Sequence, residues 1–95
     1  DLRKKSKTFG KKFTVILSEK NSKSIYVPPG FAHGFCALEK HNYVVYSCTN
    51  YRNKVSERGI IYNDKTLNIN WPIKKPIVSI KDKSNLTYIN FIKSL

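Results

Sequence analysis

The chain has 95 residues and a formal net charge of +12, from 18 Lys and Arg against 6 Asp and Glu. This length allows one domain at most, and a chain this short buries only about 60% of the surface that its unfolded state exposes. No apolar run approaches the roughly 20 residues of a membrane span, and no signal-peptide pattern opens the sequence. We therefore expect neither a membrane-spanning helix nor a secretory signal in this sequence. The absence of methionine indicates a piece of a longer protein.

Alternating apolar residues predict strands in the first half of the chain. The segment from about Lys12 to Ser18 alternates with a period of two and fits a strand with at least one buried face. A second short strand is predicted over 24–27. Two further β-rich runs, 33–38 and 42–48, flank Glu39-Lys40-His41 and predict a hairpin. An even loop centred on Lys40 and His41 would pair Phe35 with Tyr46 and His33 with Cys48, placing His33 and Tyr46 on one sheet face, whereas an odd loop would not.

The second half of the chain is less regular. A loose stretch over 49–54 precedes a short apolar run, 60–62, and the turn signal Asn63-Asp64-Lys65. Alternation over 67–71 ends at Pro72, and Pro76 confines any later strand to an edge. The spacing of apolar residues from Ser84 to Leu95 partly matches a helix, so residues 83–95 are expected to form a C-terminal tail or short helix. Several short strands with closely spaced turns favour an all-β fold, an antiparallel barrel or half of a jelly roll.

His33 is the residue that the local sequence presents most clearly. Pro28 and Pro29 restrict the backbone, Gly30 permits a tight bend, and an aromatic-rich run follows. The turn therefore delivers a histidine to the start of a predicted strand, which is a common way to present a binding residue. By itself, such a histidine is equally well interpreted as a strand residue with its hydrogen bonds satisfied.

The spacing of the histidines and cysteines does not suggest a metal site. His33, His41, Cys36 and Cys48 contain no close pair such as Cys-x-x-Cys or His-x-His. We therefore expect no metal, and we expect both cysteines to be buried free thiols. The lysines are spread along the whole chain, which is more typical of a solvated basic surface than of a dedicated polyanion-binding face.

Short motifs follow one another along the chain up to about Asp82. They are Asp1-Leu2-Arg3-Lys4, Thr8-Phe9-Gly10, Pro29-Gly30-Phe31-Ala32-His33-Gly34-Phe35, Tyr46-Ser47-Cys48-Thr49, Glu57-Arg58-Gly59-Ile60, Asn63-Asp64, Asn70-Trp71-Pro72 and Ser79-Ile80-Lys81-Asp82. In order and spacing this series resembles the C-terminal half of the dTDP-4-dehydrorhamnose 3,5-epimerase family. The resemblance implies a cupin-type jelly roll, a cytoplasmic homodimer, a nucleotide-sugar substrate, a role in rhamnose and surface-polysaccharide synthesis, and no cofactor.

The resemblance also implies two catalytic residues. Epimerisation next to a ketone needs a base that removes a carbon-bound proton, a group that stabilises the enolate, and an acid on the opposite face. Tyr46 matches the family's proton-donating tyrosine, and Asp82 matches the aspartate that orients the base histidine. That histidine belongs to the N-terminal half of the family, so this segment is not expected to be active alone. Without the resemblance, Tyr46 would be a packing residue and Asp82 a solvated loop carboxylate.

Five further positions are implied to bind substrate. Three of them, His33, Glu57 and Lys81, match substrate-contacting positions, and Lys81 would complement the diphosphate. Arg52 stands where the family commonly stacks an aromatic ring on thymine, with Tyr51 one residue earlier, so base preference is left open. By sequence alone, Glu57 beside Arg58 would be a surface ion pair of little energetic weight, and Lys81 a solvated lysine.

Three other functions are compatible with these residues. One is an epimerase that inverts a single carbon, and another is a non-catalytic cupin that binds a sugar nucleotide. The third is a basic β-domain that binds nucleic acid through exposed aromatic side chains.

Overall fold

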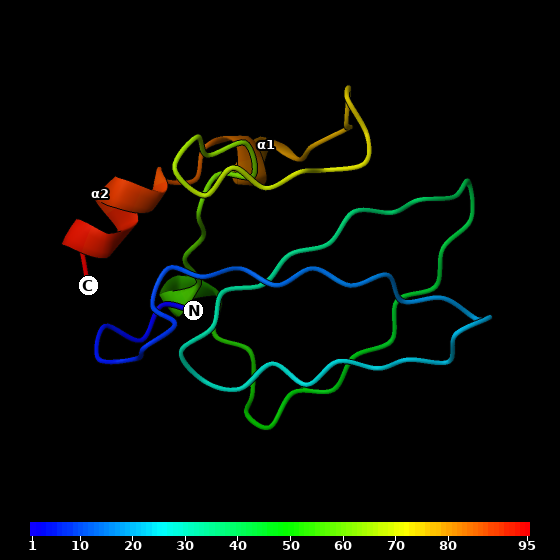
Figure 1. Cartoon of the computed structure of the whole chain (residues 1–95), viewed down its shortest axis with the longest axis horizontal. Helices are drawn as coiled ribbons and strands as arrows, with labels where there is room; N and C mark the ends of the chain where they lie inside the picture. Colours follow the sequence, from blue (N-terminus) through cyan, green and yellow to red (C-terminus); the bar gives the residue numbers. More distant parts are fainter. The chain divides into compact units, whose positions relative to one another are not determined.

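Backbone pairing between extended segments is almost absent from the computed structural model, which describes all of residues 1–95. The chain divides into two compact units, Asp1–Gly34 and Phe35–Leu95. The short helices all lie in the second unit, and two of them follow one another in orange and red near the C-terminus (Figure 1). They are the 3-10 helix η1 (Lys54–Ser56), α1 (Ile80–Lys83) and α2 (Tyr88–Lys93).

The prediction of an all-β, cupin-type jelly roll is wrong for this chain. The four segments predicted as strands, 12–18, 24–27, 33–38 and 42–48, belong to no sheet. The chain's β-pairing consists of one isolated parallel bridge between Ile60 and Leu86, with Ile61 N donating to Leu86 O at 2.8 Å.

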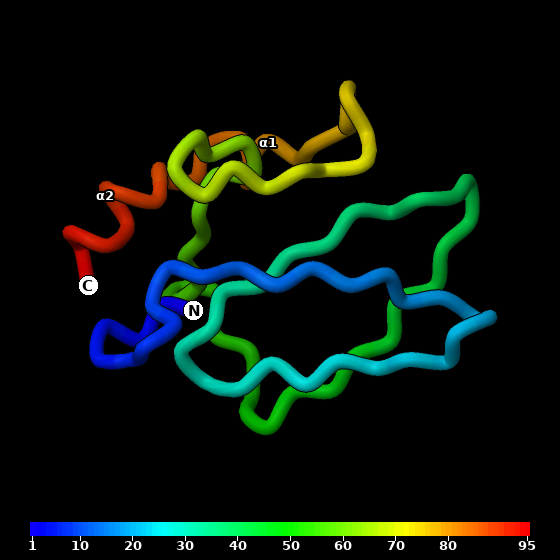
Figure 2. Tube along the Cα trace, viewed as in Figure 1, coloured from blue at the N-terminus to red at the C-terminus, as the bar shows by residue number.

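The predicted hairpin has a turn but no ladder. The Asn42 side-chain amide donates to the carbonyl of Glu39 at 2.6 Å, and the chain reverses there (Figure 2). The pairing of Phe35 with Tyr46 does not form, and His33 and Tyr46 share no sheet face because the sheet is absent.

Alternation of apolar and polar residues is not sufficient to form a strand. A period of two specifies which side chains a strand would bury, but a strand exists only when its N–H and C=O groups pair with a neighbouring strand. None of these segments is paired in this way with another segment. Their apolar side chains accordingly stay in solvent: Phe13 is 78% exposed and Val45 94%.

Asn21 closes a turn of the first unit. Asn21 Oδ1 accepts from the backbone N–H groups of Ser18 and Lys23 at 3.1 and 3.0 Å, and Asn21 Nδ2 donates to Ile16 O at 2.8 Å. Its neighbour Ser22 adopts a positive φ of 51°. A side chain therefore satisfies the backbone groups that a reversed chain leaves unpaired, as asparagine commonly does in turns.

Asp64 joins two separate stretches of the second unit. It is 6% exposed and accepts from the backbone N–H of Leu67 and of Tyr88, each at 2.8 Å. Burial alone raises the pKa of the Asp64 carboxyl, but bonds from the N–H groups of Leu67, Tyr88 and Thr66 together lower it below its ordinary value. The charged carboxylate thus holds the 64–67 turn to the first residue of α2.

α2 occupies part of the segment 84–95 for which the spacing predicts a helix. Thr87 precedes it and accepts from Asn90 N at 3.3 Å, which satisfies one free donor of the first turn. Phe91, on α2, is the one buried apolar residue at 7% exposure. None of the helices has the length and apolar character that crossing a membrane requires.

Candidate functional site

Glu57 lies between two cationic side chains of the second unit. Arg52 donates through Nε to Glu57 Oε1 and through Nη2 to Oε2, the latter at 3.2 Å. Lys81 Nζ donates to the same Oε2 at 2.6 Å. Three of the predicted substrate-binding residues, from two distant stretches of sequence, therefore form one ion-pair cluster, called here the Glu57 cluster (Arg52, Glu57, Lys81).

Local structure explains why Arg52 and Glu57 meet. Asn53 caps η1 by accepting from Val55 N at 3.1 Å, and Glu57 N closes the turn onto Lys54 O at 3.3 Å. This single 3-10 turn returns the chain on itself, so two residues five positions apart lie side by side.

Lys81 reaches the cluster from α1. Ser79 accepts from Asp82 N at 3.1 Å and caps the helix, while Ser84 Oγ donates to the carbonyls of Ile80 and Lys81 at its other end. These serines satisfy backbone groups that a four-residue helix cannot pair internally. The capped turn sets where the lysine leaves the backbone.

The cluster strongly perturbs its carboxylate. Hydrogen bonds from Arg52 first and then from Lys81 lower the pKa of Glu57 from 4.5 to about 2. The same bond with Glu57 raises the pKa of Arg52, and Tyr46 adds a smaller electrostatic contribution in the same direction. Glu57 is therefore ionised at neutral pH and suits a binding or orienting role better than proton transfer.

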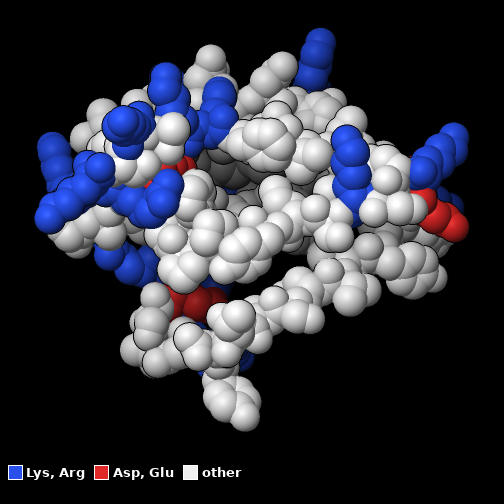
Figure 3. All heavy atoms as spheres, turned by 60° about the horizontal axis from the view of Figure 1, so that its bottom comes forward, with Lys and Arg blue, Asp and Glu red and all other residues white.

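Two cations around one carboxylate leave an excess positive charge that solvent can reach. The side chains of Arg52 and Lys81 are 62% and 66% exposed. Lys81 uses one of its three donors on Glu57, so two are left for another acceptor. In Figure 3 the Lys and Arg side chains, drawn in blue, extend from the surface into solvent. The Glu57 cluster is thus chemically suited to phosphate oxygens.

Tyr46 contributes to the raised pKa of Arg52, as the smallest of its causes. The ring is 77% exposed. Tyr51 is fully exposed, beside a depression lined by residues 48–51. Asp82 follows Lys81 in α1 and is exposed, with its carboxylate bonded to no other group of the chain. A carboxylate in that state is open to an incoming imidazole.

His33 belongs to the first unit, Asp1–Gly34. It is exposed and follows the turn at Gly30, whose φ is +91°. The Gly30 turn that the sequence predicts is therefore confirmed at the residue level, whereas the strand predicted after it is not.

Sequence reasoning missed the partner of Arg58. The neighbouring pair Glu57 and Arg58 suggested a surface ion pair, but the Arg58 guanidinium lies 4.7 Å from the centre of the Phe91 ring, and its Nη2 donates to Ser94 Oγ. Adjacent residues of a non-helical chain point in different directions, so neighbouring charges need not pair. Nothing in the sequence signals a partner 36 residues away.

The remaining histidine, cysteine and acidic side chains form no metal-binding cluster. No three His, Cys, Asp or Glu residues gather closely enough to hold a metal ion. Both cysteines are free thiols, but Cys48 is exposed and Cys36 half-buried, so the prediction that both are buried is wrong. The second unit thus presents an exposed cationic cluster whose chemistry suits anions, together with an exposed tyrosine and an exposed carboxylate.

Comparison with known proteins shows the family to which the chain belongs. The sequence pattern of the dTDP-4-dehydrorhamnose 3,5-epimerase family matches residues 1–89, and the chain belongs to that family. The chain is similar to proteins named dTDP-4-dehydrorhamnose 3,5-epimerase, including those of three bacteria. Over 95% of this chain it is 43% identical to the Shigella flexneri protein, over 99% it is 42% identical to that of Neisseria gonorrhoeae, and over 98% it is 37% identical to that of Escherichia coli K12.

The chain spans 50% of the Shigella protein, 29% of the Neisseria protein and 51% of the Escherichia protein. It therefore matches about half, or less, of the length of these relatives. No solved structure matches it significantly.

Proposed function

We propose that the protein carrying this chain is a 3,5-epimerase, which converts dTDP-4-dehydro-6-deoxy-D-glucose to dTDP-4-dehydro-L-rhamnose in dTDP-L-rhamnose biosynthesis. The family match over residues 1–89 carries the proposal. The Glu57 cluster supports it, because an exposed cationic surface suits the diphosphate of a nucleotide sugar. The reaction moves protons without changing oxidation state, so it requires no redox cofactor.

The chemistry proceeds through an enolate. A base removes the proton from a carbon next to the C4 ketone, the electron pair moves onto the ketone oxygen, and an acid returns a proton to the opposite face. We assign the acid to Tyr46 and the base to a histidine outside this chain, oriented by Asp82. The exposed, unbonded carboxylate of Asp82 supports this role, since it can accept an imidazole N–H.

Substrate binding is assigned to the remaining predicted residues. Lys81 binds the diphosphate, and Glu57, which accepts from both Lys81 and Arg52, holds the two cations in place. Tyr51 or the plane of the Arg52 guanidinium contacts the nucleotide base, and His33 contacts the sugar. Arg52 is engaged by Glu57 and Tyr51 is fully exposed, so the ring is the freer of the two to stack on a base.

We further propose a cytoplasmic homodimer. Large apolar side chains such as Tyr43, Val45 and Ile77 are almost fully exposed. Such surface is unfavourable in water and is commonly covered by a partner or by further chain. Sedimentation of the complete protein tests this assignment, and a monomer at micromolar concentration would refute it.

The decisive experiment follows deuterium into the substrate. The complete protein is incubated with dTDP-4-dehydro-6-deoxy-D-glucose in deuterium oxide, and incorporation at C3 and C5 is read by NMR. Deuterium at both carbons supports the proposal, and deuterium at one carbon indicates a single-carbon epimerase. No incorporation by a folded protein that still binds dTDP would leave a non-catalytic binding protein.

The assignment of Tyr46 has its own test in the same assay. Tyr46→Phe removes the acid but not the base, so full epimerisation should fall on the order of a hundredfold while proton exchange at the substrate carbon is retained. Tyr43→Phe is the matched control, because Tyr43 is an exposed tyrosine three residues away. Equal loss of exchange and epimerisation in Tyr46→Phe would remove this residue from the acid role.

A further inference from the structure

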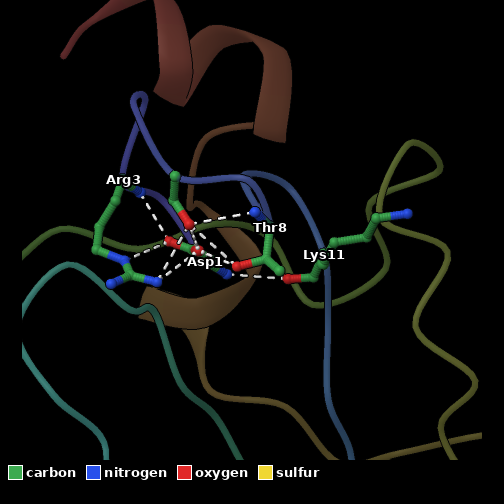
Figure 4. A network of polar contacts seen from close by, with 5 residues as sticks. Asp1, Arg3, Thr8 and Lys11 are labelled. Carbon is green, nitrogen blue, oxygen red and sulfur yellow. Dashed lines mark hydrogen bonds and ion pairs between the residues drawn. The ribbon is translucent and has the colours of Figure 1, made fainter.

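The carboxylate of Asp1 organises the polar network of the first unit. Its side chain is only 2% exposed and accepts five hydrogen bonds (Figure 4). Oδ1 accepts from the backbone N and the Nε of Arg3, at 3.0 and 2.9 Å. Oδ2 accepts from Arg3 Nη2 at 2.9 Å and from the hydroxyls of Ser6 and Thr8 at 2.6 Å each. A carboxylate so fully bonded fixes the guanidinium in one orientation.

Backbone hydrogen bonds also join the two ends of the loop that carries this network. Asp1 N donates to Lys11 O at 2.9 Å, and Gly10 N returns a bond to Asp1 O at 2.8 Å. Gly10 has a φ of 77°, which lets the loop from residue 4 to residue 9 fold back at this point. Arg3 therefore projects from a closed loop.

Arg3 lies against the turn that precedes His33. Its guanidinium carbon is 4.5 Å from the centre of the Phe31 ring, within the range of a cation–π contact. Leu2 N donates to Gly30 O at 2.9 Å, so the backbones of the two segments also bond. A Cβ added at Gly30 would meet Arg3 Cγ at 2.5 Å, so the arginine stem passes directly over the glycine. Gly30 thus meets two needs, a positive φ and a close approach.

From this contact we infer that Arg3, held by Asp1, is a positioning residue for His33. His33 follows Phe31 by two residues in the turn that Arg3 covers. Its own ring has no partner in the chain, so the placement of the histidine depends on the backbone before it. The inference rests on the proposed function, in which His33 contacts the sugar. It adds a residue that acts through His33, so that its loss moves a substrate contact.

The experiment uses two substitutions in the complete protein. Arg3→Gln removes the charge and the guanidinium fork. Arg3→Lys keeps the charge but lacks the planar fork that matches both oxygens of Asp1, so it should behave like Arg3→Gln. Lys7→Gln is the matched control, because Lys7 is an exposed cation of the same loop and its substitution makes the same change in net charge.

Two readouts separate positioning from general destabilisation. The first is the Cε1–Hε1 NMR resonance of the His33 ring, assigned with His33→Gln. The second is the division of the kinetic effect between KM and kcat. Arg3→Gln and Arg3→Lys should shift the His33 resonance and raise KM on the order of tenfold or more, since small misplacements of substrate contacts are costly. Lys7→Gln should change neither quantity.

An unchanged His33 resonance in a folded Arg3→Gln protein overturns the inference, as does a KM equal to that of Lys7→Gln. Should Arg3→Gln fail to fold, Phe31→Leu is the second variant, because it removes the ring under the guanidinium and keeps an apolar side chain. It should shift the same resonance, and an unchanged resonance there also overturns the inference. The resonance needs no turnover, so an inactive wild-type protein refutes the proposed function and leaves this test intact.

Discussion

Substitution of Asp64 by asparagine tests how α2 is attached to the rest of the second unit. The carboxylate is 6% exposed and accepts one backbone N–H from Leu67 and one from Tyr88, 24 residues away. Asparagine has nearly the same shape but offers one accepting oxygen, and its NH₂ group would face the other donor. One bond is therefore lost, and a buried N–H is left without an acceptor.

The expected loss follows from the two bonds. A hydrogen bond to a charged group contributes about 1.5–3 kcal/mol, so Asp64→Asn should destabilise this attachment by about that amount. Because about 1.4 kcal/mol corresponds to a factor of ten, protection of the Tyr88 amide should fall about ten- to hundredfold. The effect also has a pH dependence. The pKa of Asp64 lies below its ordinary 3.8, so its contribution is present above pH 3.8 and is lost as the pH falls below that value.

Native-state hydrogen exchange of the complete protein measures the Leu67 and Tyr88 amides separately from the rest of the chain. Glu39→Gln is the control, because it removes an exposed carboxylate of the same unit. Equal protection of the Tyr88 amide in Asp64→Asn and wild type would refute the argument. So would an equal loss in Glu39→Gln, because the effect would then follow net charge alone.

Two further outcomes are expected. The Glu57 carboxyl should titrate with a midpoint of about 2 by ¹³C NMR; its stabilising contribution is complete above pH 4.5 and lost as the pH falls through about 2, and Arg52→Gln should move the midpoint toward 4.5. A wild-type midpoint near 4.5 would exclude the Glu57 cluster in solution. Trp71→Phe removes the 2.7 Å bond from Trp71 Nε1 to Tyr62 O and should lower the free energy of unfolding by about 0.5–1.5 kcal/mol. Urea denaturation measures the change, and stability equal to wild type would contradict the role of that bond.

Short-range features followed from the residues alone. Gly30 lies in the tight bend that its position after two prolines indicates, and its φ there is 91°. Asn63-Asp64-Lys65 lies in a chain reversal where Asp64 N bonds to Ile61 O at 3.2 Å. The collinear motifs also led to the family that the comparison shows for residues 1–89. These features depend on groups a few residues apart or on the identity and order of the residues.

The sequence by itself therefore determined the turns, the family and the candidate residues. Only the tertiary structure decided which of those residues meet. Glu57 pairs with Lys81 across 24 residues, and Arg58 turns away from it to Phe91 and Ser94. The same distinction explains the failed prediction of a sheet. Alternation is a property of one segment, whereas a ladder requires a second segment in register, and no local pattern states whether that neighbour is present.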